Sequence, residues 1–213
     1  ITIGNSTAGA ITVGADGLSK LAPFALVSGG AINLNGVVSS DDIITLTGGS
    51  GAVVSGDGNL FVGDLLLNGS DAIYNLNTAT GNRIQTLAAA GVRSVNVKND
   101  TSLTVGTVGS THGVTATGDI TLEADATNEN DGHLTLNQPV TTTSGLITLV
   151  GENFFHEASY MGGDIVQGSG RYLIYAPSPD KASITEASAD YSKHYAQSYT
   201  AGVIPSYAST GNW

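Results

Sequence analysis

The apolar and polar residues of this chain alternate in many short triplets. Three segments share the pattern glycine, any residue, apolar, threonine, leucine: Gly118–Leu122, Gly132–Leu136 and Gly145–Leu149. A period of two is typical of a half-buried strand, in which two of the three side chains point inward. Turn-forming residues bound nearly every triplet. Because glycines and β-branched residues also disfavour helix up to about residue 175, the sequence predicts an all-β fold of many short strands.

The triplets recur at a nearly constant distance along the chain. Two series of apolar residues advance in nearly equal steps, and the second series trails the first by about half a step. The first series is Ile11, Ile32, Val53, Ile73 and Val95, and the second is Ile44, Leu65, Ile84 and Leu103. Self-similarity at this period, with two or three strands per repeat, predicts a right-handed parallel β-helix with coils of about 20 residues.

In such a fold the Ile, Val and Leu residues stack inward, while Thr and Asn face outward. Asn75 and Asn96, one such step apart, are one predicted ladder on the outer face. A β-sandwich is the structural alternative, but it does not require the recurrence. The segment Gly81–Ala90 has the composition of a short helix, yet it falls on the strand series.

The spacing changes after Val105. Ile120, Leu134 and Ile147 follow one another at clearly shorter steps. They either form successive sides of one coil or mark coils with lengthened loops. The acidic stretch 125–131 has the composition of such a loop.

The composition shifts near Tyr160, because seven of the eight tyrosines lie from there onward. We therefore predict a β-helix over residues 1–171 and a capping or linking segment, rich in Tyr and Pro, over residues 172–213. A helix over 182–194 is possible here, with Ser183 as the N-cap residue and Glu186 three positions later. A cover of this kind protects strand edges that would otherwise be open.

Charge and composition narrow the function classes. The chain has 213 residues, a net charge of −11, charged residues at only 12 % and no cysteine. Nucleic-acid binding is disfavoured because phosphates need Lys and Arg partners. The absence of cysteine excludes disulfides and thiol chemistry. No apolar run is long enough for a membrane-spanning helix. The chain shows no signal peptide and begins within the strand pattern, so we expect either a mature piece or a cut fragment of a longer protein.

The end of the chain carries a family resemblance. Its parts are the strand Gly170–Tyr175, the proline loop Ala176–Pro179, an aromatic stretch at Tyr191 and Tyr195, and the closing Gly211–Trp213. Together with the Gly-x-Ile-Thr-Leu triplets, this arrangement resembles a boundary element of filamentous haemagglutinin-type exoproteins, the two-partner-secretion adhesin family of Gram-negative bacteria. The family's amino-terminal secretion domain has no counterpart in this sequence.

The resemblance implies a protein that is secreted or attached to the bacterial cell surface, exported through an outer-membrane pore. It implies an adhesin or a structural rod, for host-cell attachment or for a biofilm matrix, without catalysis. The expected partner is a host or matrix glycan or a protein receptor. The alternative is a β-helix protein that binds or cleaves polysaccharides.

An enzyme of that class would need acidic residues stacked on adjacent coils. Only two pairs have such a spacing, Asp64 with Arg83 and Asp100 with Asp119, and each pair is separated by nearly one coil. Coincidence accounts for pairs at this frequency, so we predict no catalytic residue. His112, His133, His156 and His194 are scattered without zinc-ligand spacing, so no zinc site is predicted.

Calcium is the most reasonable cofactor to test, although none is predicted. Gly69–Tyr74, which contains Asp71, matches half of a calcium-binding nonapeptide that works only in tandem. The loop at 125–131 offers oxygen ligands, but its glycine is not placed as an EF-hand requires. The candidate ligands are Asp71, Asp125, Asn128, Glu129 and Asp131. Three Asn-x-Ser/Thr sequons begin at Asn5, Asn68 and Asn99.

Overall fold

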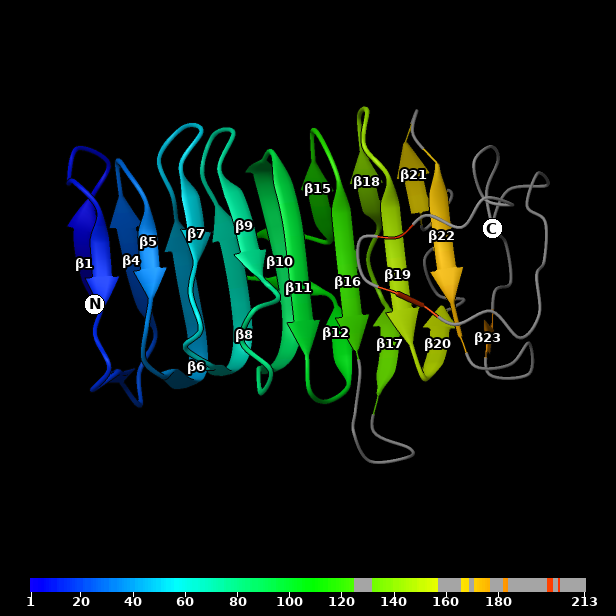
Figure 1. The fold of residues 1–213 in the computed structure, drawn as a ribbon, viewed down its shortest axis with the longest axis horizontal. Helices are drawn as coiled ribbons and strands as arrows, with labels where there is room; N and C mark the ends of the chain where they lie inside the picture. The colour runs from blue at the N-terminus through cyan, green and yellow to red at the C-terminus, as the bar shows by residue number, and fades with distance from the viewer. Residues whose placement is uncertain are drawn as a thin grey trace.

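The protein is a parallel β-solenoid. The computed structural model describes residues 1–124, 132–156, 166–168, 171–176, 182–183, 199–200 and 203. Within these residues every regular element is a strand, and the strands stack into about seven turns (Figure 1). No segment of the described residues forms a helix that is long and apolar enough to cross a membrane. In Figure 1 the front strands run downward and the rear strands upward as the chain advances from left to right, so the coil is right-handed.

One side of the solenoid is a sheet of eight parallel strands. Their spatial order is the order of the chain, because each strand pairs with its equivalent one coil earlier and one coil later. The strands are β2 (Ile11–Val13), β5 (Ile32–Leu34), β7 (Val53–Ser55), β9 (Ile73–Leu76), β11 (Ser94–Asn99), β16 (Ile120–Ala124), β19 (Ile147–Gly151) and β22 (Tyr172–Tyr175).

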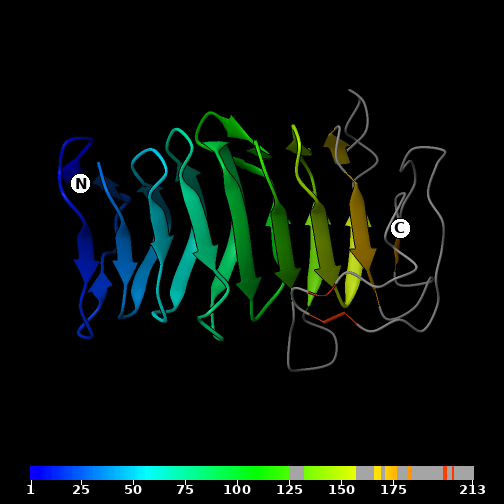
Figure 2. The same ribbon diagram turned by 45° about the horizontal axis from the view of Figure 1, so that its top comes forward.

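A second sheet of thirteen strands closes the coil. Its strands are β1 (Thr2–Asn5), β3 (Leu18–Ser19), β4 (Phe24–Ser28), β6 (Val38–Thr47), β8 (Leu60–Asn68), β10 (Arg83–Val92), β12 (Leu103–Val105), β15 (Val114–Ala116), β17 (His133–Leu136), β18 (Val140–Thr142), β20 (Asn153–His156), β21 (Val166–Gly168) and β23 (Ala182–Ser183). A register shift between Ser40 and Ile43 bends this sheet, so that it supplies the rest of the perimeter (Figures 1 and 2).

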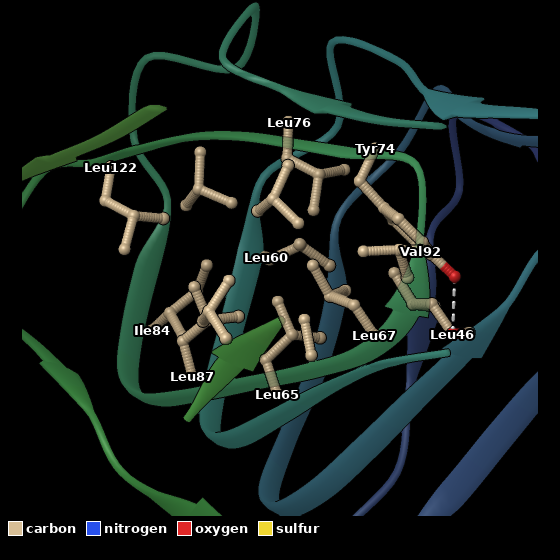
Figure 3. Packing of buried hydrophobic residues seen from close by; sticks show 14 of the residues in the cluster. Leu46, Leu60, Leu65, Leu67, Tyr74, Leu76, Ile84, Leu87, Val92 and Leu122 are labelled. Atoms are coloured by element: carbon tan, nitrogen blue, oxygen red, sulfur yellow. Dashed lines mark hydrogen bonds between the residues drawn. The ribbon is translucent and has the colours of Figure 1, made fainter. Parts of the chain in front are cut away.

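The core lies between the two sheets and runs along the whole stack. It consists mainly of Leu, Ile and Val side chains that occupy equivalent positions in successive coils (Figure 3). One column, which starts with a half-buried isoleucine at the first coil, illustrates this arrangement. It contains Ile11, Ile32, Val54, Tyr74, Val95, Ile120, Ile147 and Tyr172. Stacking like on like buries apolar surface in every coil without any long-range cross-link.

The register of the predicted series is partly wrong. Ile11 pairs with Ile32 as predicted, but the next inward residues are Val54 and Tyr74. Val53 and Ile73 pair with each other on the outer face. The step from Ile32 to Val54 is one position longer than the step before it, and one added residue moves a strand's side chains to the opposite face.

The second series changes column in a similar way. Ile44 pairs with Leu65 as predicted. In the next coil, however, the register partner of Leu65 is Leu87. Ile84 pairs with Val62 instead. All of these residues are buried, so the prediction that they lie in the core is right. The prediction that Leu65 and Ile84 occupy the same position in successive coils is wrong.

The structure decides the open alternatives of the sequence. Parallel pairing of all neighbours in the two large sheets excludes a sandwich, and the segment that resembled a short helix forms most of β10. Ile120 pairs with Ile147 in the eight-stranded sheet, while Leu134 pairs with Leu103 in the other sheet. Ile120 and Ile147 therefore lie on the same side one full coil apart, and Leu134 lies on the other sheet between them. This coil is longer than the coils nearer the N-terminus, so the alternative of lengthened coils is correct.

The described residues of the segment predicted as a cap or linker include two strands. β22 extends the eight-stranded sheet by pairing with β19, and β23 pairs with β20. Ala182 and Ser183 are therefore in a strand and not in a helix, because their backbone groups join the ladder of the thirteen-stranded sheet. The rest of the predicted helix, 184–194, lies outside the described residues. The boundary at residue 171 between the β-helix and the capping or linking segment stays a prediction.

Candidate functional site

The outer face of the eight-stranded sheet carries one short polar side chain per coil in a single line. We call this line the polar column. Consecutive members are register partners, so they lie one strand spacing apart, about 4.8 Å. Its members are Thr12, Asn33, Ser55, Asn75, Asn96 and Thr121. The predicted pairing of Asn75 with Asn96 is confirmed within this column.

The polar column is solvent-accessible, because each member is exposed or half-buried. Asn33 donates from Nδ2 to Oγ1 of Thr12 at 3.4 Å, so neighbouring members reach one another. Amides and hydroxyls both donate and accept, and none of these groups carries a charge. The column therefore presents an uncharged hydrogen-bonding strip parallel to the solenoid axis.

The two flanks of the polar column differ in chemistry. On one side lie Val53, 37 % exposed, and its register partner Ile73, and these form a short apolar strip. On the other side, Lys98 Nζ and Glu123 Oε1 are 2.7 Å apart on adjacent coils. The two side chains are 28 % and 12 % exposed. Because the opposite charges are in contact, each charge is largely compensated by its neighbour. The apolar strip thus flanks the column at Ser55 and Asn75, and the ion pair flanks its other side at Asn96 and Thr121.

The C-terminal end of the polar column is covered. Thr148 and Leu173 continue it on β19 and β22, yet they are only 8 % and 2 % exposed. In Figure 1 the red stretches of the described C-terminal chain cross in front of this part of the sheet, near β19. The chain therefore closes the column after Thr121.

Tyr199 anchors this cover. Its ring centroid is 5.2 Å from that of Tyr175 on β22. Burial raises the pKa of Tyr199, and the nearby carboxylate of Glu123 raises it further. Tyr199 thus lies close to the Lys98–Glu123 pair that flanks the column.

A hairpin that the sequence analysis missed leaves the coil on the opposite sheet. It consists of β13 (Thr107–Val108) and β14 (Thr111–His112), an antiparallel pair. Its base is closed by a hydrogen bond from Gly113 N to Gly106 O at 2.9 Å. The segment 106–113 stands where the next coil has only the short segment 137–139. The Gly109-Ser110 dipeptide between two short β-type segments is a sequence signal that could have predicted this hairpin.

The hairpin folds against the outside of the thirteen-stranded sheet. β13 and β14 contact β10, and β13 also contacts β8. Val108 and Ala88 are completely buried, although neither belongs to the main core cluster. Thr107 Oγ1 and His112 Nδ1 are 3.0 Å apart and link the two hairpin strands. The hairpin is therefore packed against the sheet, and it contributes a buried apolar residue, Val108, outside the main core.

The structure does not stack the two pairs that have nearly the spacing of one coil. Asp64 lies opposite Thr86, whereas Arg83 lies opposite Phe61 and places its guanidinium carbon 5.9 Å from that ring centroid. Asp100 follows β11 and Asp119 precedes β16, so the second pair lies at opposite ends of neighbouring strands. Both pairings are wrong, because each coil is longer than the stretch of chain that separates the paired residues.

Of the calcium candidates, Asp71 alone lies in the described part of the chain. Asp71 stands in a left-handed turn with φ of +64°, and Arg93 binds both of its carboxylate oxygens, with Nε 2.8 Å from Oδ1. The hydrogen bonds from Arg93 lower the pKa of Asp71. No group of three or more His, Asp or Glu side chains within the described ranges could hold a metal ion. Asp125, Asn128, Glu129 and Asp131 lie outside those ranges.

The three described histidines lie in separate elements, and one of the sequon asparagines, Asn99, is buried. His112 is in the hairpin, His133 begins β17, His156 ends β20 and His194 lies outside the described residues. The Asn99 side chain is completely buried. It accepts from Ile84 N at 2.8 Å and donates to neighbouring backbone carbonyls. The Asn99 side chain therefore stabilises a corner of the coil, and its buried amide is not accessible for glycosylation.

The structure thus offers two surface features, the polar column on one sheet and the hairpin on the other. Of these, only the column repeats with the coil and extends along the molecule. It is therefore the candidate site. No protein-family model, curated protein or solved structure matches this chain.

Proposed function

We propose that this chain is a rod segment of a secreted or cell-surface adhesin, and that it attaches through an outer face without catalysis. The observation that carries the proposal is the polar column on a single continuous core. Six coils present the same kind of uncharged side chain in register. A surface of this kind suits repeated weak contacts with an extended partner.

The rod is stiff for a physical reason. Each coil is joined to its neighbours by backbone ladders in both sheets, and the buried side chains form one uninterrupted cluster. Interiors packed to this degree transmit strain and compress little. Contacts displayed on the column therefore keep fixed spacings, which lowers the entropy cost of binding several of them together.

The resemblance to filamentous haemagglutinin-type exoproteins supports the location. The resemblance implies a rod outside a Gram-negative cell that acts in host attachment or in a biofilm matrix, after export through an outer-membrane pore. The acidic chain without cysteine suits a rod stabilised by packing and backbone hydrogen bonds.

A bead assay tests the proposal. Beads coated with the folded chain are expected to be retained on epithelial cells or on surface-grown bacteria, whereas beads coated with the heat-unfolded chain are not. Equal retention of both preparations would contradict it. Release of new reducing ends from a polysaccharide panel during the same incubation would favour the cleaving alternative instead.

A further inference from the structure

We propose that the polar column binds an uncharged polysaccharide, which lies along the solenoid axis from Thr12 to Thr121. This inference rests on the proposed adhesive function and specifies its ligand. Its carrying observation is a juxtaposition: a line of neutral amides and hydroxyls next to the apolar strip of Val53 and Ile73.

The chemistry of the column selects a polyhydroxylated partner. Sugar hydroxyls donate and accept hydrogen bonds, and so do the side chains of Asn, Ser and Thr. Sugar rings also have apolar C–H faces, which the Val53–Ile73 strip can cover. Ligand sites commonly combine apolar area with a few polar groups that fix orientation. A partner with one type of surface alone would leave half of this face without contacts.

Electrostatics select an uncharged partner. The chain carries a net charge of −11, which repels anionic polymers over most of its surface. The cation beside the column, Lys98, already forms an ion pair with Glu123. No charged residue is a member of the column itself. Binding is therefore expected to be insensitive to salt, because no counterions need to be displaced.

The covered end fixes the length and direction of the binding site. Six strands at about 4.8 Å spacing make a strip of roughly 24 Å. Beyond Thr121, Thr148 and Leu173 are covered, and Tyr199 packs on Tyr175. A bound chain can therefore extend past the first coil but not past the sixth.

Affinity electrophoresis tests this inference. The folded chain is run through gels that contain hydroxyethylcellulose, dextran or mannan as neutral probes, and polygalacturonate as an anionic probe. We expect at least one neutral polymer to retard the chain at low and at high salt, and polygalacturonate to have no effect. Retardation by none of the neutral polymers, or only by the anionic polymer, would overturn the inference.

Matched variants locate the site. Asn75→Val with Asn96→Val removes two amides from the column and keeps strand-forming residues. This double variant is expected to weaken retardation at least tenfold. The control is Thr45→Val with Thr47→Val, two half-buried positions on β6 of the other sheet, and it should bind like the original chain. Circular dichroism and urea unfolding confirm that both variants fold.

The outcomes separate this inference from the proposed function. Equal losses in the column variant and in the control would overturn the column as the site. If the column variant loses polymer retardation but its beads still adhere to cells, the polysaccharide site stands and adhesion has another receptor. If beads adhere and no neutral polymer retards the chain, the inference fails and the adhesive rod remains.

Discussion

At the scale of single residues, the solenoid depends on a few buried polar groups. The Tyr74 hydroxyl is buried between two coils. It lies 2.7 Å from Leu46 O and within hydrogen-bonding distance of Asn68 O, and it accepts from Gly48 N at 3.2 Å (Figure 3). Burial raises the pKa of Tyr74 to about 12, although the hydrogen bond from Gly48 opposes this shift.

Tyr74→Phe should lower the free energy of unfolding at neutral pH by about 2 kcal/mol, because buried backbone groups lose their partner. The pH dependence has a defined sign. An unfolded tyrosine ionises near pH 10, so the contribution of the raised pKa is complete below about pH 10 and is lost as the pH approaches 12. Urea unfolding at pH 7 and at pH 11 should therefore show a smaller deficit of the variant at the higher pH. A constant deficit would contradict this account.

Asn99 closes a corner with its side chain. It joins Ile84 N and O on one strand to Thr101 O and Ser102 O in the next turn. Asn99→Ala should therefore destabilise the protein by about 2–3 kcal/mol, because several buried groups lose partners. Asn75→Ala, at a half-buried position of the outer column, is the matched control and should cost less than about 1 kcal/mol. Urea unfolding of the two variants measures the difference, and equal costs would show that burial of the amide is not the cause.

At the scale of turns and strands, stacked glycines set how closely successive corners approach. A Cβ atom added to Gly36 would lie 2.1 Å from Gly14 O, and one added to Gly58 would lie 2.1 Å from Gly36 O. Only a residue without a side chain fits such a backbone contact. The turns between the two sheets are therefore fixed by glycine as firmly as the strands are fixed by their apolar residues.

Gly36→Ala is expected to cost about 3 kcal/mol or more, because backbone must move to relieve the contact. Gly9→Ala is the control, since an added Cβ atom there meets nothing within 4 Å. Urea midpoints measure both variants. A Gly36→Ala protein as stable as the Gly9→Ala protein would show that the corner can widen without cost.

The hairpin at 106–113 is expected to be dispensable for folding. Replacing it with Asn-Gln-Pro, as in the next coil, should retain the β-rich circular dichroism spectrum and cost about 1–3 kcal/mol through the lost burial of Val108. Val108→Ala provides a milder comparison. An insoluble or unfolded replacement variant, alongside a folded Val108→Ala protein, would show that the hairpin is needed for the coil to close.

Much of the fold at this scale could be predicted from the sequence, because every coil needs inward apolar residues and coils of similar length put them at a regular spacing. The exact column could not be predicted where two apolar residues adjoin. Val53 and Val54 are equally suited to the core, and only the preceding turn decides between them. The two candidate pairs, Asp64 with Arg83 and Asp100 with Asp119, are not stacked for the same reason. The length of its coil brings Asp64 into register with Thr86, which lies three positions beyond Arg83 in the chain.

The candidate site was less predictable. Asn75 and Asn96 stood out because they are identical, but the rest of the column mixes Thr, Ser and Asn, which turns also use. The cover at its end could not be predicted, since Tyr199 and Tyr175 are brought together by chain that carries no strand pattern. Local periodicity thus predicts the coil, whereas contacts between a coil and a distant segment leave no period to detect.

At the scale of the whole molecule, stability is distributed along the stack, because each coil packs mainly on its neighbours. Among the coils that the structure describes in full, the first is the least protected. Ile3 is 37 % exposed, whereas its register partner Leu26 and the equivalent Leu46 in the following coil are buried. Amide hydrogen exchange should therefore be fastest in β1 and β2 and slowest in β8 to β11. Uniform protection along the stack would mean that the solenoid opens only as a single unit.

The direction of the ladders has a mechanical consequence. All strands of the two large sheets lie across the long axis, so their backbone hydrogen bonds point along it. A force that stretches the rod end to end therefore loads one coil boundary at a time and peels the chain away in steps. Each step frees one coil, or about 70–90 Å of extended chain. Under tension, such a rod would lengthen in steps as single coils unfold, instead of breaking at one point.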